Sequence, residues 1–242
     1  DDGWHSYQYT TLQGGNVPRD EVASARADLD ERTFQQEYEA QFVNYSGVIY
    51  YAFKREESVR QHIDSIDVIH IGMDFNLDPM SAVLMTRKGD TMHVFDEIVM
   101  FGSNTDEMVD EIRARYSKAR GIIIYPDPAS RQRKTSAGGR TDLSILQNAG
   151  FEVRVRNSHA AIRDRINAVN ARLLSKQGQR RLYVDPKCKK VIESLERHTY
   201  KEGTSQPEKD GFDHMNDALG YAVEYLFPIR KANTTVQPQR WT

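Results

Sequence analysis

The chain has 242 residues, with 33 basic and 35 acidic side chains and a formal net charge of −2. This length can bury the core of one large domain, and 28% charged with 10% aromatic residues is typical of a folded protein rather than a disordered one. Its apolar runs are far shorter than the roughly 20 residues that span a bilayer. Cys188 is the single cysteine, which excludes an intrachain disulfide and a cysteine-based zinc cluster and fits a reducing compartment.

The small net charge hides two blocks of opposite sign. Residues 60–112 contain eleven acidic and three basic side chains, whereas residues 113–165 contain twelve basic and four acidic ones. Such blocks are often no more than solvated faces of a domain. They also suit a basic surface for a polyanion beside an acidic pocket for cations, and charge alone leaves both interpretations open.

The N-terminal part of the chain differs from the rest. After a glycine-rich loop, the pattern predicts one helix over residues 19–42, in which Phe34, Tyr38 and Phe42 recur at four-residue spacing on one face. We interpret this part as a connector that packs on another structure. An ordinary N-terminal helix that caps this same domain is the alternative.

An α/β pattern begins near residue 68. Strands are expected over residues 68–73, 81–87, 91–99, 122–125, 151–156 and 181–184, and helices over residues 106–119, 141–150, 160–174, 189–197 and 213–227. Three consecutive strands before the first helix predict a mixed central sheet, with an antiparallel meander beside parallel strands and with helices on its faces.

Two of the apolar strands end in an aspartate. Asp74 follows the strand at residues 68–73, and Asp127 follows the strand at residues 122–125. Sites in open α/β sheets are built where neighbouring strands end, and two partly desolvated carboxylates repel each other unless a cation lies between them. Each aspartate alone is more often a turn former, but their recurrence after the two most apolar strands favours a shared site.

The last expected helix carries a third group of acids. His214 and Asp217 are three residues apart and share a helix face, and Asp213 is expected to cap the helix. Together with Asp74 and Asp127 they would form an oxygen-rich site that favours Mg²⁺ or Mn²⁺ over zinc. Two such ions roughly 3.5–4 Å apart can activate water and stabilise the leaving oxygen in phosphodiester cleavage.

These motifs resemble the nuclease domain of the large terminase subunit of tailed bacteriophages, which has the RNase H-like fold. The matching segments are Gly72-Met73-Asp74-Phe75-Asn76, Tyr125-Pro126-Asp127-Pro128-Ala129 and Asp217-Ala218-Leu219-Gly220-Tyr221, with His214 one turn ahead of the last. The resemblance covers nearly the whole chain. It implies that Asp74, Asp127 and Asp217 are catalytic metal ligands for two ions, and that His214 is a further ligand or orients water.

The resemblance also implies a domain organisation. The phosphate-binding motif GxxxxGK[ST] does not occur, and the sequence has no Gly-Lys pair. We therefore expect the ATPase of this family to be missing from the chain. Residues 1–50 are then a linker-like segment from that missing domain, residues 51–228 an RNase H-like nuclease domain, and residues 229–242 a disordered tail.

Further charged residues are candidates for auxiliary roles. Glu97 ends the third expected strand and is either an additional acid near the metals or a solvent-facing edge residue, and Asp213 is a second auxiliary candidate. Basic residues in the loop after Asp127 are expected to grip DNA phosphates without reading sequence: Arg131, Arg133, Lys134 and Arg140. A second set either extends that surface or pairs with acids: Arg154, Arg156, Arg163 and Arg165.

The leading hypothesis is a metal-dependent endonuclease that cuts double-stranded DNA concatemers during viral genome packaging. The resemblance implies double-stranded DNA, the packaging ATPase domain, the portal and the small terminase subunit as partners, with no membrane. It also implies the host cell cytoplasm as the location, rather than the mature virion. The alternatives are another RNase H-like polynucleotidyl transferase, such as a resolvase or transposase core, and a non-catalytic DNA-binding or motor-docking module.

Overall fold

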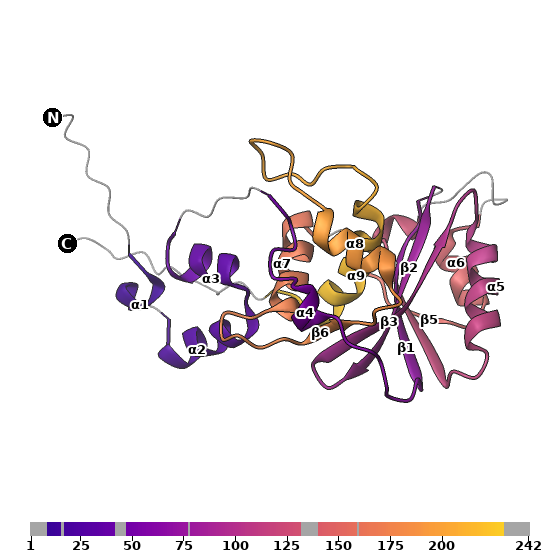
Figure 1. Cartoon of the computed structure of the whole chain (residues 1–242), viewed down its shortest axis with the longest axis horizontal. Coiled ribbons are helices and arrows are strands. Elements are labelled where there is room, and N and C mark those ends of the chain that lie inside the picture. Colours follow the sequence, from indigo (N-terminus) through magenta and orange to yellow (C-terminus); the bar gives the residue numbers. More distant parts are fainter. Residues whose placement is uncertain are drawn as a thin grey trace.

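A six-stranded mixed sheet lies between two layers of helices in the computed structural model (Figure 1). The structure describes residues 9–15, 17–41, 47–76, 78–131, 140–158 and 160–229. Within that part of the chain, no helix is long and apolar enough to cross a membrane. The mixed sheet flanked by helices confirms the fold that the order of elements predicts.

The strands follow the spatial order β5-β4-β1-β2-β3-β6. Their bounds are β1 Val68–Asp74, β2 Met80–Lys88, β3 Thr91–Met100, β4 Gly121–Pro126, β5 Glu152–Val153 and β6 Leu182–Val184. The first three strands form the expected antiparallel meander, while β4 pairs with β1, β5 with β4, and β6 with β3 in parallel. The strand expected over residues 151–156 is much shorter than predicted, because β5 is an edge strand with only β4 beside it.

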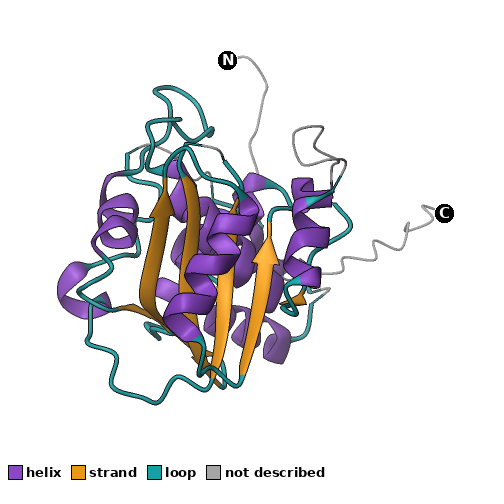
Figure 2. Ribbon diagram, turned by 90° about the vertical axis from the view of Figure 1, so that its right-hand side faces the viewer, coloured by secondary structure: helices purple, strands orange, loops and turns teal. Residues whose placement is uncertain are grey.

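Helices cover both faces of the sheet. One layer holds α7 Ile162–Leu173, α8 Lys189–Arg197 and α9 Asp213–Leu226, and the other holds α5 Thr105–Tyr116 and α6 Asp142–Asn148, which face the viewer in Figure 2. The remaining helical segments are α1 Thr11–Gly14, α2 Arg19–Asp28, α3 Glu31–Tyr38, α4 Arg55–Ser58 and the 3-10 turn η1 Pro128–Arg131. The side chain of Asn104 accepts a hydrogen bond from the Glu107 amide at 3.0 Å and so caps α5, one of the two caps that the sequence suggests.

The single helix expected over residues 19–42 is wrong. The chain is extended at Leu29, whose side chain is buried, so that α2 ends there. The Asp30 carboxylate then accepts a hydrogen bond from the Thr33 amide at 3.2 Å and starts α3 as its N-cap. Burial of a leucine at the break and a strong capping residue after it explain why two helices replace one.

The apolar face that the spacing predicts is present on α3. Phe34 and Tyr38 are buried and stack with their ring centroids 5.1 Å apart, against Val22 and Leu29 of the preceding segment. Phe42 lies outside the described residues. So do residues 230–242 of the expected tail, whereas Ile229 packs against this N-terminal cluster.

Helix α2 is attached to the rest of the molecule through its C-terminal end. The Lys176 amide donates to the Leu29 carbonyl at 2.7 Å, and Arg181 Nη1 donates to the Ala27 carbonyl at 3.0 Å. Donors and cations are favourable at this end of a helix because its last carbonyls carry partial negative charge. The described N-terminal helices therefore have a defined place against the sheet domain, and the assignment of residues 1–50 as a linker stays a prediction.

Strand β1 presents different residues to the two layers. Ile69, Ile71 and Met73 belong to the core under α5 and α6. Gly72 faces α9, and a Cβ placed on it would lie 1.8 Å from the main-chain oxygen of Ala218. Only glycine permits this approach of helix and strand, so Gly72 sets the depth at which α9 lies on the sheet.

We expect Gly72→Ala to lower the free energy of unfolding by about 3 kcal/mol, the upper end for an overpacked site, because a backbone atom of α9 has to move. Urea unfolding followed by circular dichroism measures this difference. Gly121→Ala is the matched control, because its Cβ would meet only the Val68 methyl groups at 3.9 Å. Equal losses in the two variants would contradict this account of Gly72.

His70 is a buried titratable group on β1. Its Nδ1 lies 2.9 Å from the Tyr125 hydroxyl. Burial lowers the pKa of His70 to about 4, and the positive charges of Arg87 and Arg154 add to that effect. The folded protein therefore keeps this imidazole neutral, whereas the unfolded chain protonates it near pH 6.5.

Because its folded pKa is depressed, His70 contributes stability that is present above pH 6.5 and is lost as the pH falls towards 4. We expect the parent to lose about 2 kcal/mol more than His70→Asn, which does not titrate, between pH 7 and pH 5. Urea unfolding at the two pH values provides the measurement. An identical pH dependence in both proteins would show that His70 is not the source.

Candidate active site

The ends of β1 and β4 bring the first two aspartates side by side. The two strands are parallel, with Met73 opposite Pro126 in the last ladder pair. One residue further along each strand are Asp74 and Asp127, and the Asp127 amide donates to the Met73 carbonyl at 3.1 Å. Asp74 is buried and Asp127 half-buried. The expected meeting of two carboxylates at the sheet edge is therefore present.

Helix α9 brings His214 to the same edge. Its Nδ1 lies 3.1 Å from Asp74 Oδ2 and 3.1 Å from the side-chain amide of Asn76. The pKa of His214 is raised, first by the hydrogen bond to Asp74, against the effect of burial, and also by the negative charges around it. A proton on His214 is thus shared with a candidate metal ligand, and Asn76 is a neighbour that the sequence motif contains but that spacing does not single out.

The expectation that Asp213 caps α9 is wrong. Phe212 already has helical backbone angles and occupies the N-cap position, so that Asp213 is the first helical residue and makes no cap bond. Its Oδ1 is buried without a hydrogen-bond partner among the described residues, 3.8 Å from His214 Nε2. An acceptor oxygen in this state is available to a cation or a water at the site.

Asp217 is held by an arginine that the sequence does not connect with it. Arg165 Nη2 of α7 donates to Asp217 Oδ1 at 2.6 Å. Burial is the main cause that raises the pKa of Asp217, and the charges of Asp74 and Asp213 raise it further, whereas Arg165 lowers it. Asp217 therefore lies within electrostatic reach of the other acids.

Tyr221, one turn after Asp217, reports the convergence of the three strand and helix acids. Burial is the main cause that raises the pKa of its hydroxyl, and the negative charges of Asp217, Asp127 and Asp74 add to it. The guanidinium of Arg165 lies over the same ring, 4.5 Å from its centroid. The structure thus gathers the three predicted aspartates around one tyrosine side chain.

The donor set fits a hard divalent cation. Carboxylate oxygens and a histidine without cysteine are the ligands of Mg²⁺ and Mn²⁺, and mutual repulsion among these acids is relieved by a cation. The unpartnered Oδ1 of Asp213 adds an acceptor beside them. Within the described part of the chain, no three His, Cys, Asp or Glu side chains are already grouped around one point, so Asp74, Asp127 and Asp217 would turn towards a bound ion.

Glu97 is not part of this group. Its two carboxylate oxygens accept hydrogen bonds from the backbone amides of Lys190 at 2.9 Å and Val191 at 2.8 Å, in the first turn of α8. Burial raises the pKa of Glu97, and these two amides oppose that rise. The structure gives Glu97 the role of capping a helix from a neighbouring strand, which neither interpretation of the sequence foresees.

Two of the four predicted DNA-binding residues are described. Arg131 ends η1 directly after Asp127 and donates to the Val155 carbonyl at 3.2 Å. Arg140 forms an exposed ion pair with Asp106 at 3.1 Å, which is weak enough for DNA to replace. Arg133 and Lys134 lie outside the described residues, and the DNA-binding role of all four stays a prediction.

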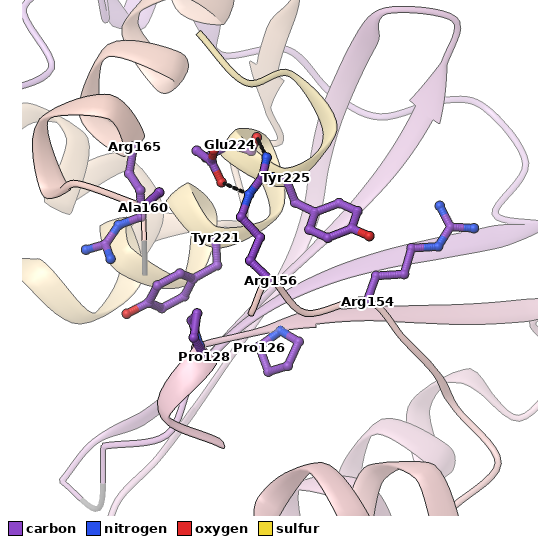
Figure 3. Close-up of a pocket in the computed structure, with 9 residues that line it drawn as sticks. All are labelled: Pro126, Pro128, Arg154, Arg156, Ala160, Arg165, Tyr221, Glu224 and Tyr225. Carbon is purple, nitrogen blue, oxygen red and sulfur yellow. Dashed lines mark hydrogen bonds and ion pairs between the residues drawn. The ribbon is translucent and has the colours of Figure 1, made fainter. Parts of the chain in front are cut away.

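A small pocket adjoins the acids between the end of β4, α7 and α9 (Figure 3). Pro126 and Pro128, which flank Asp127, form one wall. The other lining residues are Arg154, Arg156, Ala160, Arg165, Tyr221, Glu224 and Tyr225. Of the arginines expected to extend a basic surface, Arg156 is instead paired with Glu224 at 2.7 Å and Arg165 with Asp217.

Residues 71–226 match the family described as the terminase RNaseH-like domain. The chain belongs to this family. It is also similar to the terminase large subunit of Escherichia phage T5, with 23% identity over 240 residues that cover 91% of this chain and 51% of that protein.

Solved structures share the fold of this terminase domain. The large terminase of a thermophilic bacteriophage matches with a TM-score of 0.68 and 16% identity, over 89% of this chain and 53% of that one. The P22 large terminase nuclease domain matches with a TM-score of 0.58 and 18% identity, over 76% and 94%. The large terminase nuclease of another thermophilic phage, G20c, with bound cobalt, matches with a TM-score of 0.53 and 12% identity, over 75% and 98%. The chain spans about half the length of the T5 protein and of the first of these structures.

We expect Mn²⁺ to raise the melting temperature of the terminase domain, because an ion that binds only the folded state stabilises it by about 2.7 kcal/mol at 100 times its Kd, or roughly 5–10 °C. Asp74→Asn should remove most of this shift. Differential scanning fluorimetry with and without Mn²⁺ measures it.

Glu97→Gln is the control for that experiment. It should lower the melting temperature, because two charge-assisted bonds to α8 are weakened, and yet keep the Mn²⁺ shift. Loss of the shift in Glu97→Gln, or its retention in Asp74→Asn, would contradict the assignment of ligands.

Proposed function

We propose that this chain is the nuclease part of a large terminase and cleaves double-stranded DNA with the help of divalent metal ions during genome packaging. The observation that carries the proposal is the meeting of Asp74, Asp127 and Asp217 around Tyr221. Membership of the terminase RNaseH-like domain family supports a nuclease over a resolvase or transposase core. The cobalt in the similar G20c nuclease supports a divalent ion at these acids.

The side chains of the site divide the work of phosphodiester cleavage. Asp74 and Asp127, adjacent on parallel strands, would hold one ion, with Asp74 shared by a second ion that Asp217 binds. Bound divalent ions supply the charge that acidifies water and stabilises the leaving oxygen. His214 orients the Asp74 carboxylate through its hydrogen bond and is placed to move a proton at that edge.

DNA binding would use the basic side of the same edge. Arg131 directly follows the turn that Asp127 starts, and its neighbours Arg133, Lys134 and Arg140 would bring further positive charge to the backbone phosphates. These contacts position the duplex and read no bases, so we expect weak sequence preference. The acidic and basic blocks of the sequence would then serve the metal ions and the DNA respectively.

The rest of the packaging machinery lies outside this chain. The large terminase of the first thermophilic bacteriophage, whose structure in complex with ATP-γ-S matches with a TM-score of 0.69, is covered over only 54% of its length. We propose that the uncovered half corresponds to an ATPase motor, and that the portal and the small terminase subunit are partners of the whole protein in the host cell cytoplasm.

A plasmid assay tests the proposal. The parent should nick and linearise supercoiled DNA with Mn²⁺ or Mg²⁺, and excess EDTA should stop it. Asp74→Asn should lower the rate by at least roughly 10²-fold, because the loss of a metal ligand removes several kcal/mol of charge stabilisation.

Asp78→Asn makes the same charge change at an exposed residue four positions away and should cut like the parent. A parent that binds duplex DNA but does not cut it with any of these metals would favour the non-catalytic DNA-binding module. Equal cutting by parent and Asp74→Asn would exclude this site.

A further inference from the structure

Arg165 is a buried cation next to the proposed metal ligands. Its side chain is 8% exposed, and it extends from α7 to the partly exposed Asp217 of α9 (Figure 3). A buried guanidinium is costly unless it is paired. The partner in this case is one oxygen of a carboxylate that the proposed reaction uses.

The contacts of Arg165 hold its guanidinium in one place. Nη2 bonds Asp217 Oδ1 at 2.6 Å, and the plane lies over the Tyr221 ring. Its Nε is buried without a hydrogen-bond partner among the described residues. An arginine that served only packing would have its donors satisfied, so Arg165 is placed for Asp217 and Tyr221 rather than for a wider network.

Asp217 needs such a partner because its other neighbours are acids. Asp74 and Asp213 both act on it with negative charge. Without a cation at Oδ1, repulsion would favour rotamers that turn the carboxylate away from Asp74. The bond to Arg165 uses one oxygen and leaves the second outside the pair.

We propose that Arg165 is a positioning residue, which fixes the rotamer of Asp217 so that its second oxygen is presented to a divalent ion. Groups that orient metal ligands in this way commonly change metal affinity when they are removed. The planar fork of arginine suits this task better than lysine, because it holds carboxylate and ring at once. The inference rests on the proposed function only in that Asp217 is a metal ligand.

The test measures Mn²⁺ affinity of the DNA-free chain by isothermal titration calorimetry, together with the Mn²⁺ concentration for half-maximal plasmid cleavage. Arg165→Gln should weaken Mn²⁺ binding by roughly 10–100-fold and shift the cleavage curve to correspondingly higher Mn²⁺. Arg165→Lys should recover part of both. Should the Gln variant not fold, the Lys variant decides, with an expected loss smaller than that range but measurable.

Arg172→Gln is the matched control. Arg172 lies on the same helix two turns later, is equally buried at 7%, and is close to Asp28 and Asp90, away from the site. It should lower the melting temperature without changing Mn²⁺ affinity. A double-mutant cycle completes the test: in an Asp217→Asn background, Arg165→Gln should add no further loss of Mn²⁺ affinity.

Three results would overturn the inference: parent-like Mn²⁺ affinity in Arg165→Gln, an equal loss in Arg172→Gln, or additive losses in the double variant. The nuclease proposal fails separately. A parent that does not cut DNA, but whose Mn²⁺ affinity falls in Arg165→Gln, would disprove cleavage and leave the positioning role standing.

Discussion

The close approach of α9 to β1 at Gly72 is the constraint on which the site depends. With the Ala218 carbonyl in the space where a Cβ would be, the helix lies directly on the central strand. That depth brings His214 within 3.1 Å of Asp74, two residues further along β1. A helix displaced by even a methyl group would separate the acid it carries from those at the strand ends. Packing density, rather than any polar contact, therefore sets the spacing of the polar groups.

The electrostatics of the site follow from that packing. Three aspartates from β1, β4 and α9 act on a single tyrosine hydroxyl, and each adds to the cost of ionising the others. Two cationic groups already offset part of that cost, with His214 bonded to Asp74 and Arg165 bonded to Asp217. The remaining negative charge is what a divalent cation would neutralise. The pocket beside Asp127 extends this mixture of acids, arginines and tyrosines away from the sheet edge (Figure 3).

Charged residues away from the site serve the architecture. Glu97 holds the first turn of α8, and Arg172 and Arg181 lie close to Asp28 of α2 and Asp90 of the β2–β3 turn. These contacts join elements far apart in the chain and place the N-terminal helices against α7 and the sheet (Figure 1). The acidic and basic blocks of the sequence are thus partly consumed in pairing, and only part of each block remains for ions and DNA.

The sequence by itself determined the strands, their order and the two aspartates at the ends of β1 and β4. Apolar runs and turn residues act locally, and parallel neighbours end at the same edge of a sheet. It also placed His214 and Asp217 on one helix face, because helical spacing is local too. Only the tertiary structure decided that Arg165 meets Asp217, 52 residues away, that Glu97 caps α8, and that burial of Leu29 breaks the N-terminal helix. Each of these depends on which surfaces pack together, and side-chain partners across a core leave no periodic trace in the chain.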